Sequence, residues 1–202
     1  MSDADPPPIA VSKPATLSGI RDDLLFNAPM RSGRSVIVYA FMLVFTALLH
    51  PGFHAALLYR LSAACHKARL VPLTIVFEKL NYHLYHCILP GDARIGPGLF
   101  LPHPLGIVLS KHARLGREVT LRQFSQVMDV TEPGVDGVVG DGVQINAFAA
   151  VSRGGSVGEE SVVAAKALVT KRVPAEHLAI GIPAGFKALR EDQKRDRSPR
   201  WR

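Results

Sequence analysis

Between Val139 and Val173 an aliphatic residue recurs at every sixth position, and this period limits the folds open to the chain. The recurring residues are Val139, Ile145, Val151, Val157, Val163 and Val169. Four positions after each stands a mostly small residue: Val143, Ala149, Gly155, Ser161, Ala167 and Val173. A period of six fits neither a helix nor a flat strand. It is typical of a parallel β-helix built from hexapeptides, in which each short strand turns one large side chain inward and tight corners join the strands.

The same period extends upstream with two interruptions. Leu105 takes the fifth position of the unit that begins at Leu101, and a two-residue slip follows it. Farther on, residues 132–138 replace one regular unit by a loop-like segment. The upstream units begin at Ile95, Leu101, Leu109, Leu115, Leu121 and Val127. We therefore expect a solenoid over residues 89–174, with about five coils of three hexapeptides each and with functional residues near the interruptions.

The rest of the chain divides into three parts. Residues 1–20 are rich in proline, alanine and serine, so we expect a disordered tail. Residues 21–88 are expected to form a helical module that covers the open end of the solenoid. Residues 175–202 are expected to form a short return segment and a basic tail, which is more simply a solvated chain end than a site for phosphates or an anionic membrane. The expected fold class is α+β.

Helical spacing predicts three helices in the module, centred on residues 36–49, starting at Pro51 and running from about Pro72 to Cys87. The first is too short to span a bilayer comfortably, and a buried helix is favoured over an interfacial membrane helix. Arg60 is expected on the outward side of the second helix. The residues of the third expected to turn inward are Ile75, Val76, Leu80, Leu84 and Cys87.

Composition and charge argue against several classes of protein. The 202-residue chain carries a formal net charge of +7 but no basic motif interleaved with aromatic residues, so no nucleic-acid partner is expected. No signal peptide is visible, and Cys65 and Cys87 show no disulfide pattern, which together indicate a cytoplasmic protein. His83 and His86 lack a third ligand at a suitable spacing, so no metal is expected. The histidines expected at polar helix-surface positions are His50, His54, His66, His83 and His86.

His103 lies just before the slip, in a stretch that resembles a known family. The stretch Pro90 to Val108 reads Pro-Gly-Asp-Ala-Arg-Ile-Gly-Pro-Gly-Leu-Phe-Leu-Pro-His-Pro-Leu-Gly-Ile-Val, and the helical run that starts at Pro51 reads Pro-Gly-Phe-His-Ala-Ala-Leu-Leu-Tyr-Arg-Leu. Both resemble the serine acetyltransferase family of hexapeptide-repeat acyltransferases. The segments 169–174 and 181–184 are similar to that family's last coil and exit, so the resemblance covers about residues 45–186.

The resemblance implies a left-handed parallel β-helix that assembles as a homotrimer, or as a pair of trimers. It also implies that acetyl-CoA binds in a groove between neighbouring subunits and that the acetyl group passes directly to the hydroxyl of a small-molecule acceptor. His103 occupies the place of the histidine in the family's Asp-His-x-x-Gly motif, which is the general base.

The chain departs from the family pattern around this histidine. The motif's aspartate is Pro102, and the family's second acidic partner, which orients the histidine, falls on Ile88, with Asp92 as the nearest substitute. The family's second histidine falls on Asp136, and the preceding arginine, which holds the serine carboxylate, is absent. An acceptor site without that cation fits a neutral sugar better than an amino acid.

Other residues extend the expected site. Where the family has Gly-Glu-Thr-Ala, the chain reads Ser-Lys111-His-Ala, followed by Thr120-Leu-Arg-Gln123. This form looks more like O-acetyltransferases that modify sugars and polysaccharides, which implies that Arg122 and Gln123 contact the acceptor together with Asp92 and Asp136. The positions that match the family's CoA contacts are Ala147, Ala165 and Lys171. Small side chains there leave room for the pantetheine arm, and the lysine can meet the phosphates.

Two other functions stay open at this point. The missing acidic partners fit a catalytically silent β-helix that serves as an assembly or regulatory subunit. A metal-dependent lyase of the γ-carbonic-anhydrase kind requires three histidines at a subunit interface, whereas only His103 and His112 lie in the expected solenoid.

Overall fold

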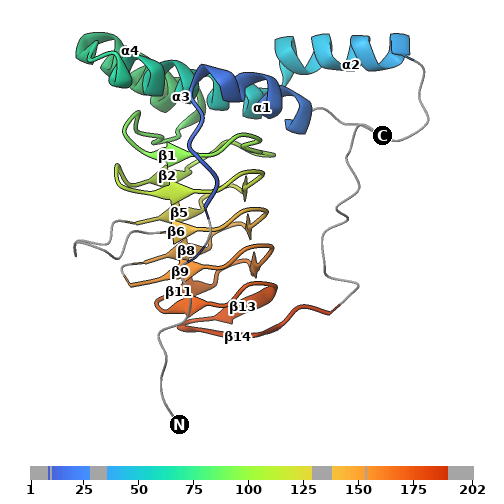
Figure 1. Ribbon diagram of the computed structural model, residues 1–202, viewed down its shortest axis with the longest axis vertical. Helices are drawn as coiled ribbons and strands as arrows, with labels where there is room; N and C mark the ends of the chain where they lie inside the picture. The colour runs from blue at the N-terminus through green and yellow to red at the C-terminus, as the bar shows by residue number, and fades with distance from the viewer. Residues whose placement is uncertain (1–8, 10, 28–35, 129–137, 153, 191–202) are drawn as a thin grey trace.

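The computed structural model describes residues 9, 11–27, 36–128, 138–152 and 154–190. Three sheets form the sides of a triangular solenoid, and a helical module covers one end (Figure 1). Ile145 lies beside Val163, 18 positions later, so one coil contains three hexapeptides. The predicted α+β fold, a helical module followed by a hexapeptide solenoid, is confirmed.

Most strands contain only two residues, because each occupies one side of a small coil. Sheet I contains β1 (Arg94–Ile95), β3 (Arg114–Leu115), β6 (Val138–Val139), β9 (Ser156–Val157) and β12 (Arg172–Val173). Sheet II contains β4 (Thr120–Leu121), β7 (Gln144–Ile145), β10 (Val162–Val163), β13 (His177–Gly181) and β14 (Ala184–Ala188). Sheet III contains β2 (Val108–Leu109), β5 (Gln126–Val127), β8 (Ala150–Val151) and β11 (Leu168–Val169). All pairs are parallel except β13 with β14, which ends the solenoid.

The corners between successive strands stack into edges of the solenoid. The II–III edge joins sheets II and III and consists of residues 101–107, 122–125, 146–149 and 164–167. The III–I edge joins sheets III and I, and its described residues are 89–93, 110–113, 128, 152, 154–155 and 170–171. Residues in different coils of one edge are therefore neighbours, although they are 18 or more positions apart in sequence.

The residues that begin the hexapeptides fill the interior, as their period predicts. None from Ile95 to Val169 is more than 2% exposed, and burying an aliphatic side chain contributes about 1.5–3 kcal/mol. At the slip Leu105 is 44% exposed, whereas Ile107, two positions later, is completely buried. The two extra residues form a turn before Ile107, where Gly106 adopts φ 64° and the Leu105 N–H donates to the His103 carbonyl (2.9 Å). The slip therefore pushes His103 and Leu105 out of the coil.

Among its described residues, the helical module contains a short 3₁₀ turn and four α-helices, one more than the sequence predicted. The turn is η1 (Leu17–Gly19), and the helices are α1 (Ile20–Asn27), α2 (Val36–Leu49), α3 (Pro51–Lys67) and α4 (Val71–Tyr85). Residues in the predicted tail contact the solenoid: the Ser12 hydroxyl donates to Asp141 (2.6 Å), and the Ala15 N–H donates to the Ile95 carbonyl (3.0 Å). Figure 1 shows this segment descending along the coils from α1.

Helix α4 is rotated relative to its prediction. Ile75, Val76, Leu80 and Leu84 are all exposed, whereas Cys87 is buried as expected. The helix instead turns polar groups inward, because Asn81 donates to the Ala55 carbonyl of α3 (2.9 Å) and Glu78 accepts from the Gly91 N–H of the first coil (2.7 Å). These hydrogen bonds decide which face of α4 packs, and a hydrophobic pattern alone does not reveal them.

Helix α2 is not buried within the chain, contrary to the prediction. Phe41 and Leu48 are 65% and 67% exposed, and Figure 1 shows the helix extending to one side of the module. Within the described residues, no single helix has the length and composition needed to cross a bilayer, although Phe41–Leu49 and Pro51–Lys67, bent by 70°, pass that test as a pair.

Arg60, expected on the outward side of α3, is completely buried. Its Nε donates to Asp23 Oδ2 (2.7 Å) and its Nη2 donates to Asp23 Oδ1 (3.0 Å). The remaining N–H groups donate to backbone carbonyls of the N-terminal segment and the first coil, namely those of Ala15, Ile95 and Gly96. All five donors of the guanidinium are satisfied, which is the condition under which a buried charge is tolerated. The prediction was wrong because the partner, Asp23, is 37 positions away and in a helix that was not predicted.

We expect Arg60→Met to lower the free energy of unfolding by about 3–5 kcal/mol, because the substitution leaves the Asp23 carboxylate buried without its cation. Denaturant titration followed by circular dichroism measures the change. Arg94→Met, at an exposed position of sheet I, is the matched control and is expected to stay within about 0.5 kcal/mol of wild type. Equal effects of the two substitutions would contradict the structural role of the buried pair.

Candidate active site

His103 lies on the II–III edge in the first complete coil, exposed at the tip of the two-residue insertion. The strand-like residue Phe100 precedes it and pairs with Thr120, and β2 follows it. The Gly106 N–H donates to the carbonyl of His86 (3.1 Å), the residue that ends α4, so the helical module holds the far side of the loop. The imidazole is accessible to a substrate and stands on a backbone fixed from both sides.

The II–III edge brings four of the predicted site residues into one column. Backbone hydrogen bonds link successive coils: Phe124 N–H to the Leu105 carbonyl (2.8 Å), Phe148 N–H to the Gln123 carbonyl (3.1 Å) and Lys166 N–H to the Ala147 carbonyl (3.0 Å). The predicted residues in this column are His103, Gln123, Ala147 and Ala165, and Arg122 is beside Gln123. The sequence analysis placed a general base and small residues in the same site. Their alignment along one edge of the solenoid is consistent with that prediction.

Two polar atoms one coil away from His103 are buried without a partner. Arg122 Nε and Gln123 Oε1 have no hydrogen-bond partner among the residues that the structure describes. Buried polar atoms are nearly always bonded to protein, water or ligand. The side chains of Arg122 and Gln123 therefore have unused hydrogen-bonding capacity on the edge that carries His103.

Two exposed aromatic rings also belong to this edge, and the sequence analysis missed them. Phe124 and Phe148 stack with ring centroids 4.8 Å apart and planes 14° from parallel. Gly106 makes room for them, because a Cβ there would lie 2.4 Å from the Phe124 ring. The two phenylalanines are 24 positions apart, which is one coil of 18 residues plus the six extra residues between β5 and β6. The regular period therefore gives no signal that places them on one edge.

His50, expected at a polar helix surface, is the N-cap of α3. Its Nδ1 accepts the Phe53 N–H (3.3 Å), so in the neutral ring the proton is on Nε2. Burial lowers the pKa of His50 below its ordinary value of 6.5, and the neighbouring His54 and His103 lower it further. The sequence does not predict this capping role, because histidine is not among the preferred N-cap residues.

His54 is also engaged and is not simply a surface group. Its Nε2 lies 2.9 Å from the Ala47 carbonyl, and its Nδ1 lies 3.2 Å from the Tyr85 hydroxyl. A carbonyl only accepts, so the ring proton is on Nε2 and the tyrosine donates to Nδ1. Burial raises the pKa of Tyr85, which keeps this donor protonated. His54 thereby ties the end of α2 to α4 beneath His50.

The other predicted site residues lie on the III–I edge. Asp92 lines a cleft of about 700 Å³ between this edge, the end of α3 and the N-terminal segment. Lys171 lies between β11 and β12, four coils farther along. Asp136 lies outside the described residues. Within one chain, Asp92 and Lys171 are therefore on a different edge from His103, which does not support Asp92 as its orienting partner in the same subunit.

The charged residues of this cleft give it a basic character. They are His66, Lys67, Asp92, Arg94, Lys111, His112 and Arg114. Among the described residues, no three His, Cys, Asp or Glu side chains lie close enough to hold a metal ion.

Comparison with known proteins decides the family. No protein-family profile matches the sequence. A serine acetyltransferase of Helicobacter pylori is 30% identical over 153 residues, which cover 72% of this chain and 85% of that protein. The chain belongs to the serine acetyltransferase family. A putative serine acetyltransferase of Schizosaccharomyces pombe is 32% identical over 148 residues, 70% of this chain and 53% of that protein.

Solved serine acetyltransferases share the fold. That of Brucella abortus superimposes with a TM-score of 0.74 at 23% identity, covering 85% of this chain and 68% of that one. That of Neisseria gonorrhoeae gives 0.72 at 22% identity, covering 88% and 70%. The solenoid is accordingly a left-handed parallel β-helix, as the resemblance implied, and the prediction of an acyltransferase of this family is confirmed. The family implies acetyl-CoA as co-substrate.

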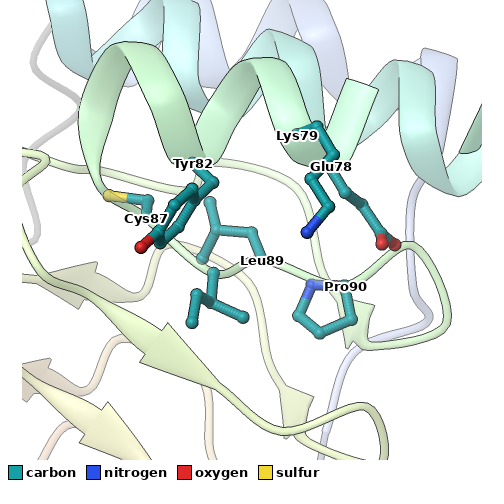
Figure 2. A pocket seen from close by; sticks show the side chains of 7 residues that line it. Glu78, Lys79, Tyr82, Cys87, Leu89 and Pro90 are labelled. Atoms are coloured by element: carbon teal, nitrogen blue, oxygen red, sulfur yellow. The ribbon is translucent and has the colours of Figure 1, made fainter. Parts of the chain in front are cut away.

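The resemblance predicts that Ile88 stands in the place of the family's orienting acid, and the structure shows what surrounds Ile88. A pocket of about 190 Å³ lies between α4 and the first coil, lined by Glu78, Lys79, Tyr82, Cys87, Ile88, Leu89 and Pro90. Figure 2 shows Glu78 and Lys79 extending from α4 toward the coil, with Tyr82 and Cys87 at the other end. Burial raises the pKa of the Cys87 thiol to about 11, so it stays protonated and is a poor nucleophile.

The lowered pKa of His50 makes the stability of this serine acetyltransferase family member depend on pH. A folded pKa below 6.5 means that the unfolded chain binds the proton more tightly, so stability is complete above 6.5 and falls as the pH drops through the folded pKa. The imidazolium also loses the cap, because Nδ1–H cannot accept the Phe53 N–H.

We expect His50→Asn, which retains a side-chain cap, to reduce the loss of stability between about pH 7 and pH 5. Denaturant titrations at both pH values measure the difference. A variant with the same pH dependence as wild type would show that His50 is not the titrating group.

Proposed function

We propose that this chain transfers acetyl from acetyl-CoA directly to a hydroxyl group, with His103 as the general base. The observation that carries the proposal is the II–III edge. It presents one exposed imidazole and, in the coils beyond it, the small side chains of Ala147 and Ala165, which are partly or fully exposed. An extended pantetheine arm requires a shallow wall of that kind to bring its thioester beside a base.

The chemistry follows from the properties of imidazole. A hydroxyl is a poor nucleophile near neutral pH, and His103 accepts its proton as the oxygen attacks the thioester carbonyl carbon. The tetrahedral intermediate collapses, the carbon–sulfur bond breaks, and His103 returns the proton to the sulfur of CoA. A base so placed contributes about 10²–10⁴-fold in rate. Neither cysteine is placed to form an acyl-enzyme, since Cys87 is buried and Cys65 lies within α3.

A homotrimer completes the site in this proposal. The expected residues are divided between the two edges that border sheet III, with His103, Ala147 and Ala165 on one and Asp92 and Lys171 on the other. Cyclic symmetry packs one edge of a subunit against the other edge of the next, which brings the two halves together. The outward side chains of sheet III suit such burial, because they include Ile88, Val108, Ala150 and Leu168, whereas sheet I presents Arg94, Arg114 and Arg172.

For the acceptor we favour L-serine. A serine acetyltransferase of Neisseria gonorrhoeae and one of soybean have been solved in complex with serine. Arg122 can take the place of the family's carboxylate-binding arginine, which this chain lacks. Its Nε has no hydrogen-bond partner among the described residues, and it lies one coil from His103. A guanidinium there recognises a carboxylate by charge-assisted hydrogen bonds. A sugar acceptor is the second candidate, since the amide of Gln123 suits a neutral hydroxyl equally well.

His103→Ala is expected to lower acetyl transfer at least about a hundredfold, because it removes the base, and to leave the trimer and CoA binding unchanged. Thiol release from acetyl-CoA in the presence of L-serine measures turnover, and sedimentation and calorimetry measure assembly and binding. His83→Ala, at an exposed position of α4, is the control and is expected to match wild type. Unchanged turnover in His103→Ala would contradict the assignment of the base, and a wild type that does not bind acetyl-CoA would favour a silent assembly subunit.

The acceptor is tested by a screen of L-serine against sugars and sugar nucleotides. We expect L-serine to be the better acceptor and Arg122→Gln to raise its KM about tenfold or more, because a charged hydrogen bond is lost, while the KM for acetyl-CoA stays constant. Arg117→Gln, exposed between sheets I and II, is the matched control. Faster turnover of a sugar, with no effect of Arg122→Gln on it, would decide for the second candidate.

A further inference from the structure

We propose that His50 is a second catalytic imidazole, whose Nε2–H donates a hydrogen bond to the oxygen that becomes negatively charged when the acceptor attacks the thioester. This inference deepens the function proposed above and rests on it. It assigns an oxyanion donor, a group that acyl transfer requires and that the family resemblance does not place on this chain.

The protonation state of the His50 ring is fixed by its neighbours. Its Nδ1 accepts the Phe53 N–H in the first turn of α3, which leaves the proton on Nε2. The group therefore presents an N–H donor in the neutral state, without requiring an imidazolium. The N-terminus of α3 adds a partial positive charge that favours an anion beside it and disfavours protonation of the ring.

The electrostatic surroundings keep His50 neutral. Burial, His54 and His103 all lower its pKa. The titratable groups near it are His54 on α3, His103 on the first coil and, through His54, Tyr85 at the end of α4. None of these is acidic at neutral pH, so nothing among them stabilises a charged His50. A neutral imidazole at a helix N-terminus is a known way to polarise a carbonyl, because its N–H strengthens as a donor when charge develops on oxygen.

The position of His50 follows from a close approach of α3 to the first coil. A Cβ on Gly52 would lie 1.9 Å from the Leu101 carbonyl oxygen and 2.9 Å from Cε1 of His50. Only glycine permits this contact, and it places the His50 ring above the strand that leads into the His103 loop. Leu101 is two residues before His103, so this contact brings His50 to the base of the loop that carries His103, and His103 is among the groups that lower the pKa of His50.

The two imidazoles then have complementary roles. His103 accepts the hydroxyl proton, the acceptor oxygen bonds to the thioester carbon, and the carbonyl oxygen takes the negative charge and accepts the His50 hydrogen bond. When the carbonyl re-forms, the carbon–sulfur bond breaks and His103 gives the proton to the departing sulfur. His50 gains and loses no proton in the cycle.

The test separates capping from catalysis. Asparagine is a preferred N-cap residue, so His50→Asn retains the helix cap. With Oδ1 in the capping place of Nδ1, its amide N–H groups stand short of the place of Nε2, so the donor is withdrawn from that point, while His50→Ala removes cap and donor together. We expect kcat/KM of His50→Asn to fall about 10²–10³-fold, as for other oxyanion donors, with wild-type thermal stability and an unchanged Kd for CoA. A ketone analogue of acetyl-CoA that mimics the tetrahedral state is expected to lose affinity by the same factor.

The outcomes are distinguishable from those that test the proposed function. A wild-type enzyme that releases no CoA with any acceptor overturns the proposed function, and this inference with it. An active wild type with a His50→Asn variant of equal activity overturns the inference alone. So does a His50→Asn variant whose activity falls only in step with its thermal stability or its affinity for CoA, because a purely structural residue would behave in that way.

Discussion

The buried ion pair between Arg60 and Asp23 is the contact on which the arrangement of the molecule depends. It joins the N-terminal segment, α1, α3 and the first coil at one point, and Asp23 also accepts the backbone N–H groups of Gly98 and Leu99. The backbone contacts between the helical module and the β-helix are single hydrogen bonds, such as that from the Gly106 N–H to the His86 carbonyl, and not a continuous ladder that would by itself fix their relative position. The ion pair fixes how the module sits on the first coil. The first turn of α3 then lies against the Leu101 carbonyl. The geometry of His50 and His103 is thus set by a charge pair at another side of the first coil.

The hexapeptide repeat separates stability from function. The inward residues are almost uniformly Leu, Ile and Val, and they make each coil resemble the next. The corners are free of that constraint, so each edge of the solenoid collects residues of a different chemistry. One edge contains the imidazole, two small residues and two stacked rings, and another contains a basic cleft. A site that requires both edges of sheet III is incomplete in a single chain, which explains why sequence reasoning names residues that the structure of one chain does not bring together.

The interior of the solenoid was predictable because it depends on a local rule. A six-residue period identifies the residues that begin the hexapeptides as inward. It does not identify Ile107, which turns inward at the slip because the two extra residues form an outward turn. Counting hexapeptides in threes would also have assigned Asp92 and Lys171 to an edge other than that of His103, since one coil is three units.

The module was less predictable, because it depends on polar contacts between distant residues. Burial of Arg60 requires Asp23, and the rotation of α4 requires hydrogen bonds from Asn81 to α3 and from the first coil to Glu78. The family resemblance identified His103 but not His50. The proposed role of His50 depends on a proton on Nε2, which follows from the hydrogen bond that the Phe53 N–H donates to Nδ1. The most direct test of the account is the crystal structure of the assembled protein with CoA. We predict that the CoA thiol lies between two subunits, within hydrogen-bonding distance of His103, with Nε2 of His50 facing the same point. A CoA molecule bound elsewhere, or a thiol that neither ring approaches, would contradict the account.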